Sequence, residues 1–97
     1  MTRIEWSPRS VSDLDSIRAF IAQDSLLYAD LVVRRLVAAA EWLSQFPQIG
    51  RIVPERGEPQ LRERIVPPFR IVYRHTPDLV EIVTVFRCSR HFPSDLG

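Results

Sequence analysis

The 97-residue sequence contains no lysine, only one cysteine and only three glycines. Because Cys88 stands alone, neither an internal disulfide nor a cysteine-based metal cluster can form. The sequence has no Gly-rich phosphate loop, no Cys/His set at metal-ligand spacing and no serine on a Gly-flanked turn. Nucleotide hydrolases, metalloenzymes and serine hydrolases are therefore without support, and we expect neither a cofactor nor a metal.

Long apolar runs are also missing. No run approaches about 18 residues, and the N-terminal segment Met1–Trp6 lacks the apolar stretch of a secretory signal. A single cysteine weakly favours a reducing compartment. We therefore expect a cytoplasmic protein that makes no membrane contact.

All thirteen basic side chains are arginines, and the formal net charge is only +1. The planar guanidinium suits the phosphates of a nucleic acid or the carboxylates of an acidic peptide, although a GC-rich genome explains the missing lysines equally well. Residues 1–50 hold five arginines and six acids (net −1), whereas residues 51–97 hold eight arginines and six acids (net +2). This difference in net charge between the two halves is too small to indicate a nucleic-acid-binding tail.

The composition favours one small domain over residues 1–97. Hydrophobic residues make up 45% of the chain, close to the globular average. A domain of this size buries only about 60–70% of the surface of its unfolded chain. We therefore expect two layers rather than a sheet wrapped by helices, with one face left for a partner.

The N-terminal quarter predicts a strand and then a helix. Arg3–Trp6 alternates polar and apolar residues, and Ser7-Pro8 ends the strand because proline cannot continue a ladder. Ser10, with Asp13 three residues later, is like a capping box and predicts a helix that runs to about Asp24. The predicted buried stripe of this helix consists of Val11, Leu14, Ile17 and Ile21, widened by Phe20.

A second, more apolar helix is predicted from about Leu26 to Phe46, where Pro47 ends it. One apolar stripe consists of Leu31, Leu36, Ala39, Leu43 and Phe46, and another consists of Tyr28, Val33, Val37 and Ala40. A single partner helix cannot bury both stripes. The helix therefore lies between the first helix and a sheet, or it presents its second stripe to another chain, and the two arrangements are compatible.

Residues 47–60 contain three prolines and two glycines and predict a long loop, which is usually functional or ordered by a partner. Strands are predicted at about 61–66, 69–75 and 79–87, with turns at Pro67-Pro68 and 76–78 between them. The order β-α-α-β-β-β predicts an α+β fold with an N-terminal strand, an antiparallel two-helix hairpin and a three-stranded antiparallel meander. Because both helices come early, they should pack on one face of the sheet.

Alternation along the strands predicts where the arginines point. Arg62 and Arg64 share one face of their strand. The apolar side chains of the next strand should face the helices, which places Arg70 and Arg74 on an open face of the sheet. These apolar residues are Phe69, Ile71 and Tyr73. Such a face would suit a phosphate backbone or an acidic peptide, and the competing interpretation is a solvated face whose arginines pair with acids such as Glu63.

Few residues suggest acid–base chemistry. His91 beside Arg90 is the best candidate, because a neutral imidazole near cationic groups can act as a base. Glu55 and Glu58 lie in the predicted loop, where solvation is the simpler interpretation. The sequence around Cys88 contains no motif that indicates a catalytic nucleophile.

Four motifs in sequence order resemble the ParE/RelE toxin superfamily, and together they cover nearly the whole chain. They are Trp6-Ser7-Pro8 followed by Asp13-Leu14 and Ile17; Phe46-Pro47-Gln48-Ile49-Gly50-Arg51; Leu61-Arg62-Glu63 leading through Pro67-Pro68 to Phe69–Arg74; and Val85–Arg90. The second contains the Pro-x-x-Gly-Arg of ParE-like members and favours that branch. In the fourth, Arg87 stands where most relatives have histidine.

The resemblance implies the toxin of a type II toxin–antitoxin system, neutralised in a hetero-oligomer by an antitoxin whose C-terminal segment wraps the helices and sheet. The antitoxin would bind the second stripe of the second helix, which is Tyr28, Val33, Val37 and Ala40. ParE-like members are associated with inhibition of DNA gyrase. RelE-like members cleave messenger RNA on the ribosome, with basic residues and a C-terminal Tyr or His–Tyr.

The tail after Arg90 has no tyrosine, and the lysines typical of RelE-like sites are missing, so a non-enzymatic gyrase inhibitor is favoured. Its target-binding residues would be Arg51, Arg70, Arg74, Arg87 and Arg90. The alternative is a metal-independent, ribosome-dependent endoribonuclease whose arginines stabilise a phosphorane-like transition state. Its catalytic residues would be Arg62, Arg70, Arg90 and His91. A third possibility is a degenerate relative that binds its antitoxin without being toxic.

Overall fold

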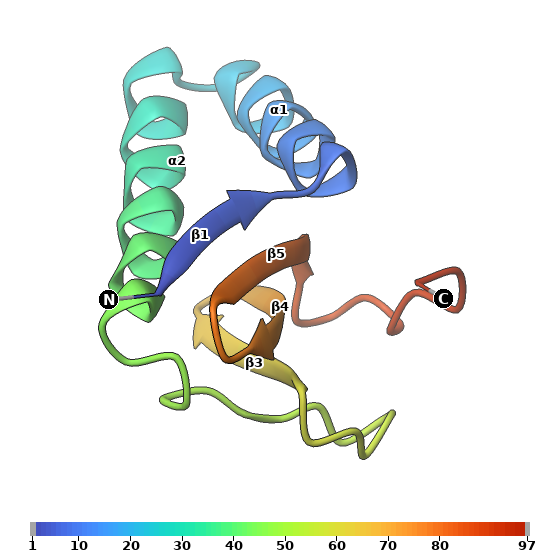
Figure 1. The fold of residues 1–97 in the computed structure, drawn as a ribbon. Coiled ribbons are helices and arrows are strands. Elements are labelled where there is room, and N and C mark those ends of the chain that lie inside the picture. The colour runs from blue at the N-terminus through green and yellow to red at the C-terminus, as the bar shows by residue number, and fades with distance from the viewer. Residues whose placement is uncertain (1, 97) are drawn as a thin grey trace.

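The computed structural model describes residues 2–96, which form two helices and a five-stranded sheet (Figure 1). The elements in chain order are β1 (Arg3–Trp6), α1 (Pro8–Ala22), α2 (Leu26–Glu41), the 3₁₀ turn η1 (Trp42–Ser44), β2 (Arg51–Ile52), β3 (Leu61–Val66), β4 (Phe69–Thr76) and β5 (Leu79–Arg87). No helix in this described range is long and apolar enough to cross a membrane.

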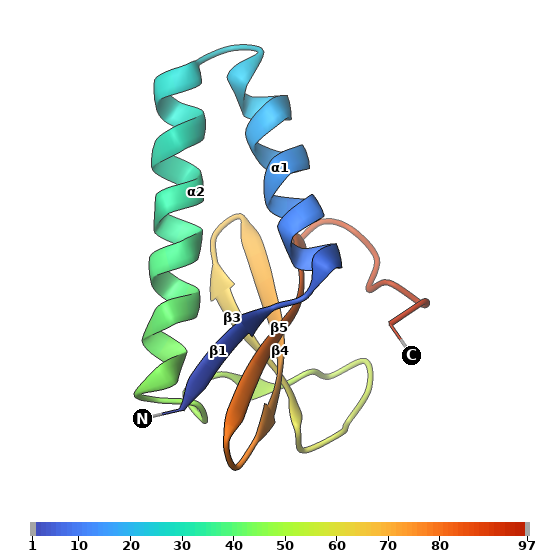
Figure 2. The ribbon, with the colours of Figure 1, turned by 45° about the horizontal axis from the view of Figure 1, so that its top comes forward.

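The sheet has the order β1-β5-β4-β3-β2. β3, β4 and β5 form the predicted antiparallel meander, and β1 pairs in parallel with β5. The α1–α2 hairpin covers one face of the sheet (Figures 1 and 2), so the predicted α+β fold is confirmed. β2 adds a fifth strand within the predicted 47–60 loop, and its two residues are too few to give a periodic signal.

α1 begins earlier than predicted, and its cap is different. Ser7 is the N-cap, because its Oγ accepts the backbone N–H of Ser10 at 3.0 Å and Pro8 occupies the first turn, where its missing N–H costs nothing. Ser10 is buried, and its hydroxyl donates to the Ser7 carbonyl at 2.8 Å. The Asp13 carboxylate does not cap the helix but accepts the backbone N–H of Val85 at 2.9 Å, which ties α1 to β5.

The buried stripes of both helices differ from the predicted ones. In α1 the half-buried Leu14, Ile17 and Ile21 pack against the core as predicted, whereas Val11 and Phe20 are exposed. In α2 the buried residues are Ala29, Val32, Leu36 and Ala40, followed by Leu43 in η1. Leu31 and Phe46 of the predicted first stripe are exposed. Val32 takes the core position next to Leu31, because one residue along a helix turns the side chain by about 100°, and Phe46 lies beyond α2, which ends at Glu41 rather than at the predicted Phe46.

The sheet carries a hydrophobic cluster on each face. On the helix side, residues of α2 and η1 pack on alternate residues of β4 and β5, with Ile4 and Trp6 of β1 at the margin. The far-side cluster consists of Val53, Leu61, Val72 and Phe86, with Val83 and Phe92 packed against it. Val53 precedes β3 in the long loop and Phe92 follows β5, so the loop and the tail cover this face. The prediction of an open face was wrong, because two irregular segments supply the second layer.

Candidate functional site

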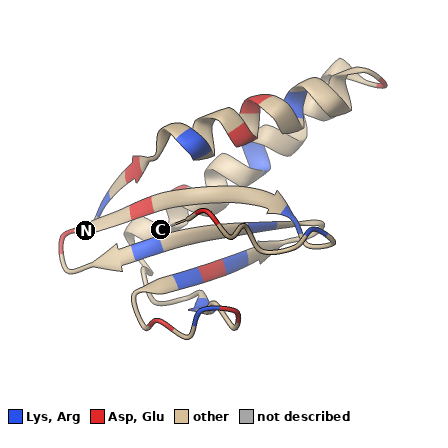
Figure 3. Cartoon of the chain, turned by 90° about the vertical axis from the view of Figure 1, so that its right-hand side faces the viewer, with Lys and Arg blue, Asp and Glu red and all other residues tan. Residues whose placement is uncertain are grey.

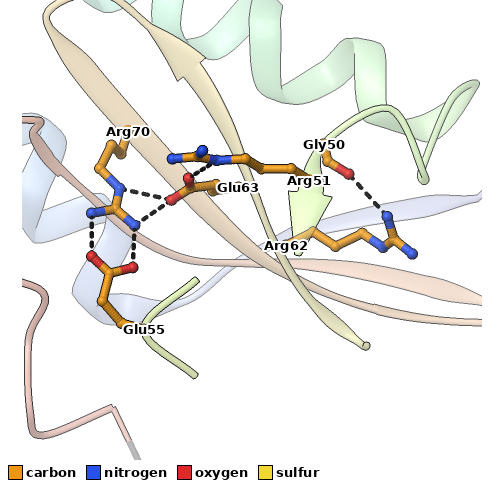
Figure 4. Close-up of polar contacts among 6 residues, drawn as sticks. All are labelled: Gly50, Arg51, Glu55, Arg62, Glu63 and Arg70. Atoms are coloured by element: carbon orange, nitrogen blue, oxygen red, sulfur yellow. Dashed lines mark hydrogen bonds and ion pairs between the residues drawn. The ribbon is translucent and has the colours of Figure 1, made fainter. Parts of the chain in front are cut away.

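The arginine-bearing face of the sheet is organised around Arg70 in β4. Its Nε donates to Glu63 Oε1 at 2.7 Å, and its two terminal nitrogens donate to the two carboxylate oxygens of Glu55 at 3.0 and 2.9 Å (Figure 4). Arg70 Nη2 also donates to Glu63. The side chains of Arg70 and Glu63 are 8% and 0% exposed, whereas Glu55 closes the network from the loop and is 42% exposed.

Two aromatic rings complete the surroundings of Arg70. Its guanidinium carbon lies 5.1 Å from the ring centroid of Phe86 and 5.4 Å from that of Phe92, at cation–π distance. The hydrogen bonds from Arg70 lower the pKa of Glu55 below its ordinary 4.5, and the same bonds raise the pKa of Arg70. Arg70 therefore stays charged and joins the sheet, the loop and the tail.

The two other arginines on this face are paired as well. Arg51 in β2 bonds to Glu63, and Arg74 Nη1 lies 3.8 Å from Glu58 Oε1. The pairing of arginines on this face with glutamates such as Glu63 is thereby confirmed, whereas the solvated face of the same interpretation was wrong, because Arg70 and Glu63 are buried. Glu55 was interpreted from the sequence as a solvated loop residue, so its pairing with Arg70 was not predicted. Helix and strand periodicity carries no signal within a loop.

On the helix side of the sheet, Tyr73 anchors the loop that follows η1. The Tyr73 hydroxyl donates to the Pro47 carbonyl at 2.8 Å and accepts the Gly50 N–H at 3.0 Å. Arg62 Nη1 donates to the Gly50 carbonyl at 2.9 Å, and Arg64 Nη1 donates to the Ala39 carbonyl in the last turn of α2 at 2.8 Å. Burial raises the pKa of the Tyr73 phenol, so this hydroxyl remains a donor.

The four ribonuclease candidates do not converge. Arg62 pairs with Tyr73 in the sheet and shares its face, whereas Arg70 lies on the opposite face (Figure 4). Arg90 lines a groove of about 290 Å³ between α1 and β5. His91 is exposed and lines a separate hollow with Glu55. Within residues 2–96, no three His, Cys, Asp or Glu side chains lie close enough together to hold a metal ion.

The predicted target-binding set is also divided between two surfaces. Arg51, Arg70 and Arg74 are engaged with glutamates, whereas Arg87 and Arg90 are exposed and make no ion pair with any described residue. Arg87 lies over the rings of Phe69 and Phe20, at 5.2 and 5.9 Å from their centroids. Basic and acidic positions are interleaved over helices and sheet rather than gathered by sign (Figure 3).

The predicted antitoxin-binding stripe of α2 is only partly available. Ala40 is fully buried in the core and cannot contact another chain, which corrects its assignment. Val33 and Val37 are half-buried, and Tyr28 is exposed. The hairpin tip carries further exposed apolar side chains that the stripe analysis did not single out, namely Leu26 and Leu27.

Comparison with known families decides the identity of the fold. The family model described as the ParE toxin of the type II toxin–antitoxin system, parDE, matches residues 4–92. The chain belongs to the ParE toxin family. Toxin RelE2 of Caulobacter vibrioides is 36% identical over 91 residues, which cover 93% of this chain and 99% of that toxin. This ParE-family chain is therefore a toxin of the type II toxin–antitoxin class.

Two solved toxin–antitoxin systems share the fold of this ParE-family toxin. The chromosomal ParDE system from P. aeruginosa superposes with a TM-score of 0.74 at 22% identity, covering 90% of this chain and 96% of the solved one. The RelBE2 complex of Mycobacterium tuberculosis superposes with a TM-score of 0.68 at 18% identity, covering 89% and 96%. The fold is thus common to proteins named for both branches.

Proposed function

We propose that this ParE-family toxin acts by binding DNA gyrase, without catalysing a reaction, and that its cognate antitoxin neutralises it in a hetero-oligomeric complex. The observation that carries the non-catalytic part of the proposal is the position of Arg70, whose guanidinium is held between Glu63 and Glu55 and is kept from solvent. The parDE family model supports the same branch.

Metal-independent RNA cleavage would require a base near the attacking hydroxyl and a cation beside the phosphorane-like transition state. Arg70 already donates to both of its carboxylate partners, and Arg62 lies on the other face. Releasing Arg70 would leave buried Glu63 with Arg51 alone, and breaking a buried pair costs about 3–5 kcal/mol. The geometry therefore supports a binding role over a catalytic one.

Arg87 and Arg90 are the members of the predicted target-binding set that remain available. Both are exposed and line the groove between α1 and β5, and no described residue forms an ion pair with either. Exposed apolar side chains flank them, Phe20 being 62% exposed. A surface that combines unpaired guanidinium groups with an aromatic ring suits a protein target, because arginines and aromatic residues dominate binding energy at interfaces.

A ribosome-dependent endoribonuclease is the second candidate, and one observation favours it. Glu55, Arg56 and His91 border an open hollow of about 550 Å³, and Glu55 and Phe92 separate this hollow from Arg70. An RNA phosphate that displaced the Glu55 carboxylate would therefore meet both Arg70 and His91. The 36% identity with the protein named toxin RelE2 also supports this candidate.

Gyrase supercoiling of relaxed plasmid, measured with purified toxin freed of antitoxin, tests the proposal. We expect loss of supercoiling, and restoration when the antitoxin is added in equal amount. Induction of the toxin alone in growing cells separates the third possibility, because a degenerate relative would leave growth unaffected. Normal supercoiling at saturating toxin would rule the proposal out.

A further inference from the structure

The groove of about 290 Å³ lies between α1 and the C-terminal end of β5, which are neighbours in Figure 2. Its lining is mainly apolar, and the apolar side chains are Ile17, Phe20, Ile21, Phe69, Val85 and Phe86. Phe69, Val85 and Phe86 are buried in the sheet, whereas Phe20 is 62% exposed. The groove is therefore a concave apolar surface with an exposed aromatic ring of α1 in its wall.

The size and the lining of the groove are those of a small-molecule site. Such sites measure about 300–1,000 Å³ and are lined mainly by hydrophobic and aromatic side chains, with a few polar groups that orient the ligand. A volume of about 290 Å³ stands at the lower end of this range. An α-helix, about 10–12 Å across with its side chains, is too wide to enter so small a space. We therefore expect a compact ligand.

Two arginines give the groove a positive charge. Arg87 and Arg90 line it, are exposed and form no ion pair with a described residue. The guanidinium carbon of Arg87 lies 5.2 Å from the ring centroid of Phe69 and 5.9 Å from that of Phe20. The rings hold the guanidinium in position without supplying a hydrogen-bond acceptor, so its N–H donors remain for a ligand.

The carboxylate that lines the groove is already engaged. Asp13 Oδ2 accepts the backbone N–H of Val85 at 2.9 Å and also the hydroxyl of Thr84. Asp13 precedes Phe20 by seven residues in α1, a rise of about 10 Å. The acidic group therefore lies at one end of the groove and the contact between Phe20 and Arg87 at the other. An anionic ligand would bind with its charge at the Arg87 end.

We propose that the groove binds a small amphiphilic carboxylate, such as a medium-chain fatty acid, with its hydrocarbon chain on Ile17, Ile21 and Val85 and its carboxylate on Arg87 and Arg90. A guanidinium and a carboxylate form two parallel hydrogen bonds, which fixes the orientation of the head group. Burial of the chain adds binding free energy in proportion to the apolar area removed from water. The inference goes beyond the proposed function and does not depend on it, because binding is measured without gyrase or antitoxin.

Other occupants fit the groove less well. A nucleic acid has phosphates for the arginines but no apolar group for the floor, and a net charge of +1 attracts it only weakly. A second copy of this chain packed face to face over the groove would bring Arg87 and Arg90 near their own equivalents. A protein segment would place no more than a side chain or two in a groove of this size. A small carboxylate satisfies both the arginines and the apolar floor.

The experiment titrates isotope-labelled toxin, free of antitoxin, with sodium octanoate and follows the amide chemical shifts by NMR. We expect saturable shifts in α1 and at the end of β5, with a dissociation constant of about 1 mM or lower. Hexanoate, which is two methylenes shorter, should bind about tenfold more weakly, because each buried methylene contributes about fourfold. Octanol, which lacks the charge, should also bind about tenfold more weakly.

Two variants test the position of the site. Arg87→Gln should weaken octanoate binding by about tenfold, because a neutral amide replaces a charged donor. Arg34→Gln on α2 is the matched control: Arg34 is also exposed but does not line the groove, and its loss should change the affinity less than about twofold. Ser16→Trp should abolish binding without removing a charge, because Ser16 is exposed and lines the groove, where the indole would take the place of the hydrocarbon chain.

Circular dichroism verifies that each variant is folded before the affinities are compared. Unchanged octanoate affinity in Arg87→Gln and Ser16→Trp would overturn the inference. The absence of a saturable shift with octanoate would do the same and would leave the groove to a protein segment. Tighter binding of inorganic phosphate than of octanoate would reveal a bare anion site, and the same shifts on concentrating the free toxin would reveal self-association, and either result would contradict the proposal.

Discussion

The hydroxyl of Tyr73 joins two points of the loop after η1, donating to the Pro47 carbonyl at 2.8 Å and accepting the Gly50 N–H at 3.0 Å. Tyr73 is fully buried in β4, so the loop is fixed to the central part of the sheet. β2 follows immediately and pairs with β3, which carries Arg62 and Glu63. The Tyr73 hydroxyl therefore positions the segment that contains Gly50, whose carbonyl accepts a hydrogen bond from Arg62, and Arg51, which pairs with Glu63.

Tyr73→Phe should destabilise the protein by about 1–3 kcal/mol, because it leaves the buried Gly50 N–H and the Pro47 carbonyl without this partner. Urea unfolding followed by circular dichroism measures the change. Tyr28→Phe is the matched control, since its exposed hydroxyl should contribute less than about 0.5 kcal/mol. Equal stability of the two variants would contradict the assigned role of Tyr73.

Gly50→Ala should be among the most damaging single substitutions. A Cβ at this position would lie 2.4 Å from the Glu63 carbonyl oxygen and 2.6 Å from Tyr73 Oη, and the Glu63 oxygen is backbone that cannot move alone. We expect a loss at the upper end of the roughly 1–3 kcal/mol that overpacking of a tight site typically costs, or failure to fold. Gly57→Ala is the comparison, because its cost comes only from a φ of +66° in open space and should be about 1 kcal/mol. Thermal unfolding that ranks the two in reverse would refute this account.

The two carboxylates around Arg70 should differ in their contribution to stability. Glu63→Ala removes the 0%-exposed partner of Arg70 and should cost about 3–5 kcal/mol. Glu55→Ala removes a carboxylate that is 42% exposed, so solvent screening limits its effect to about 0.5–1 kcal/mol. Chemical denaturation of both variants checks the order. A larger effect for Glu55 would show that the loop, rather than β3, holds Arg70.

Glu55 should also give stability a dependence on acid pH. Its folded pKa lies below the ordinary 4.5 because Arg70 donates to it, so the stabilisation is complete above that ordinary value and is lost as the pH falls through the lower folded pKa. Glu55→Gln should flatten the decline of unfolding free energy in this range. The unfolding midpoints of the variant and the parent are compared between about pH 6 and 3, the range in which carboxyl groups titrate. An identical slope for both would contradict the pairing.

The element order and the fold class were predictable because long periodic segments and proline-marked turns carry strong local signals. β1, α1 and the three-stranded meander fall close to the predicted residues, whereas α2 begins as predicted but ends at Glu41 rather than Phe46. Errors of one helical position, such as Leu31 for Val32 in the core, arose because a helix that is apolar on several sides gives an ambiguous period. Ser10 was predicted as the cap of the first helix, but Ser7 is the N-cap and Ser10 is buried in the first turn of α1.

The site was less predictable than the fold. Alternation correctly gave Arg62 and Arg64 a common face, but it could not show that this face is opposite to that of Arg70 or that loop residue Glu55 and tail residue Phe92 close over Arg70. Those contacts join segments distant in sequence, and no local pattern encodes them. The expectation of an open arginine face failed for this reason. The competing interpretation correctly gave the Arg–Glu pairs but wrongly gave a solvated face, and the pairs are needed because these charges are buried.

The central claim, a toxin that binds its target without catalysing RNA cleavage, is tested most directly by one pair of reactions run on the same preparation. Toxin freed of antitoxin is added to gyrase with supercoiled plasmid, and to a translation extract with a labelled messenger. The account predicts gyrase-dependent double-strand DNA cleavage, its persistence in His91→Ala, its weakening in Arg87→Ala or Arg90→Ala, and an intact messenger. Messenger cleavage that is abolished by Arg62→Ala or His91→Ala, with no effect on gyrase, would contradict it.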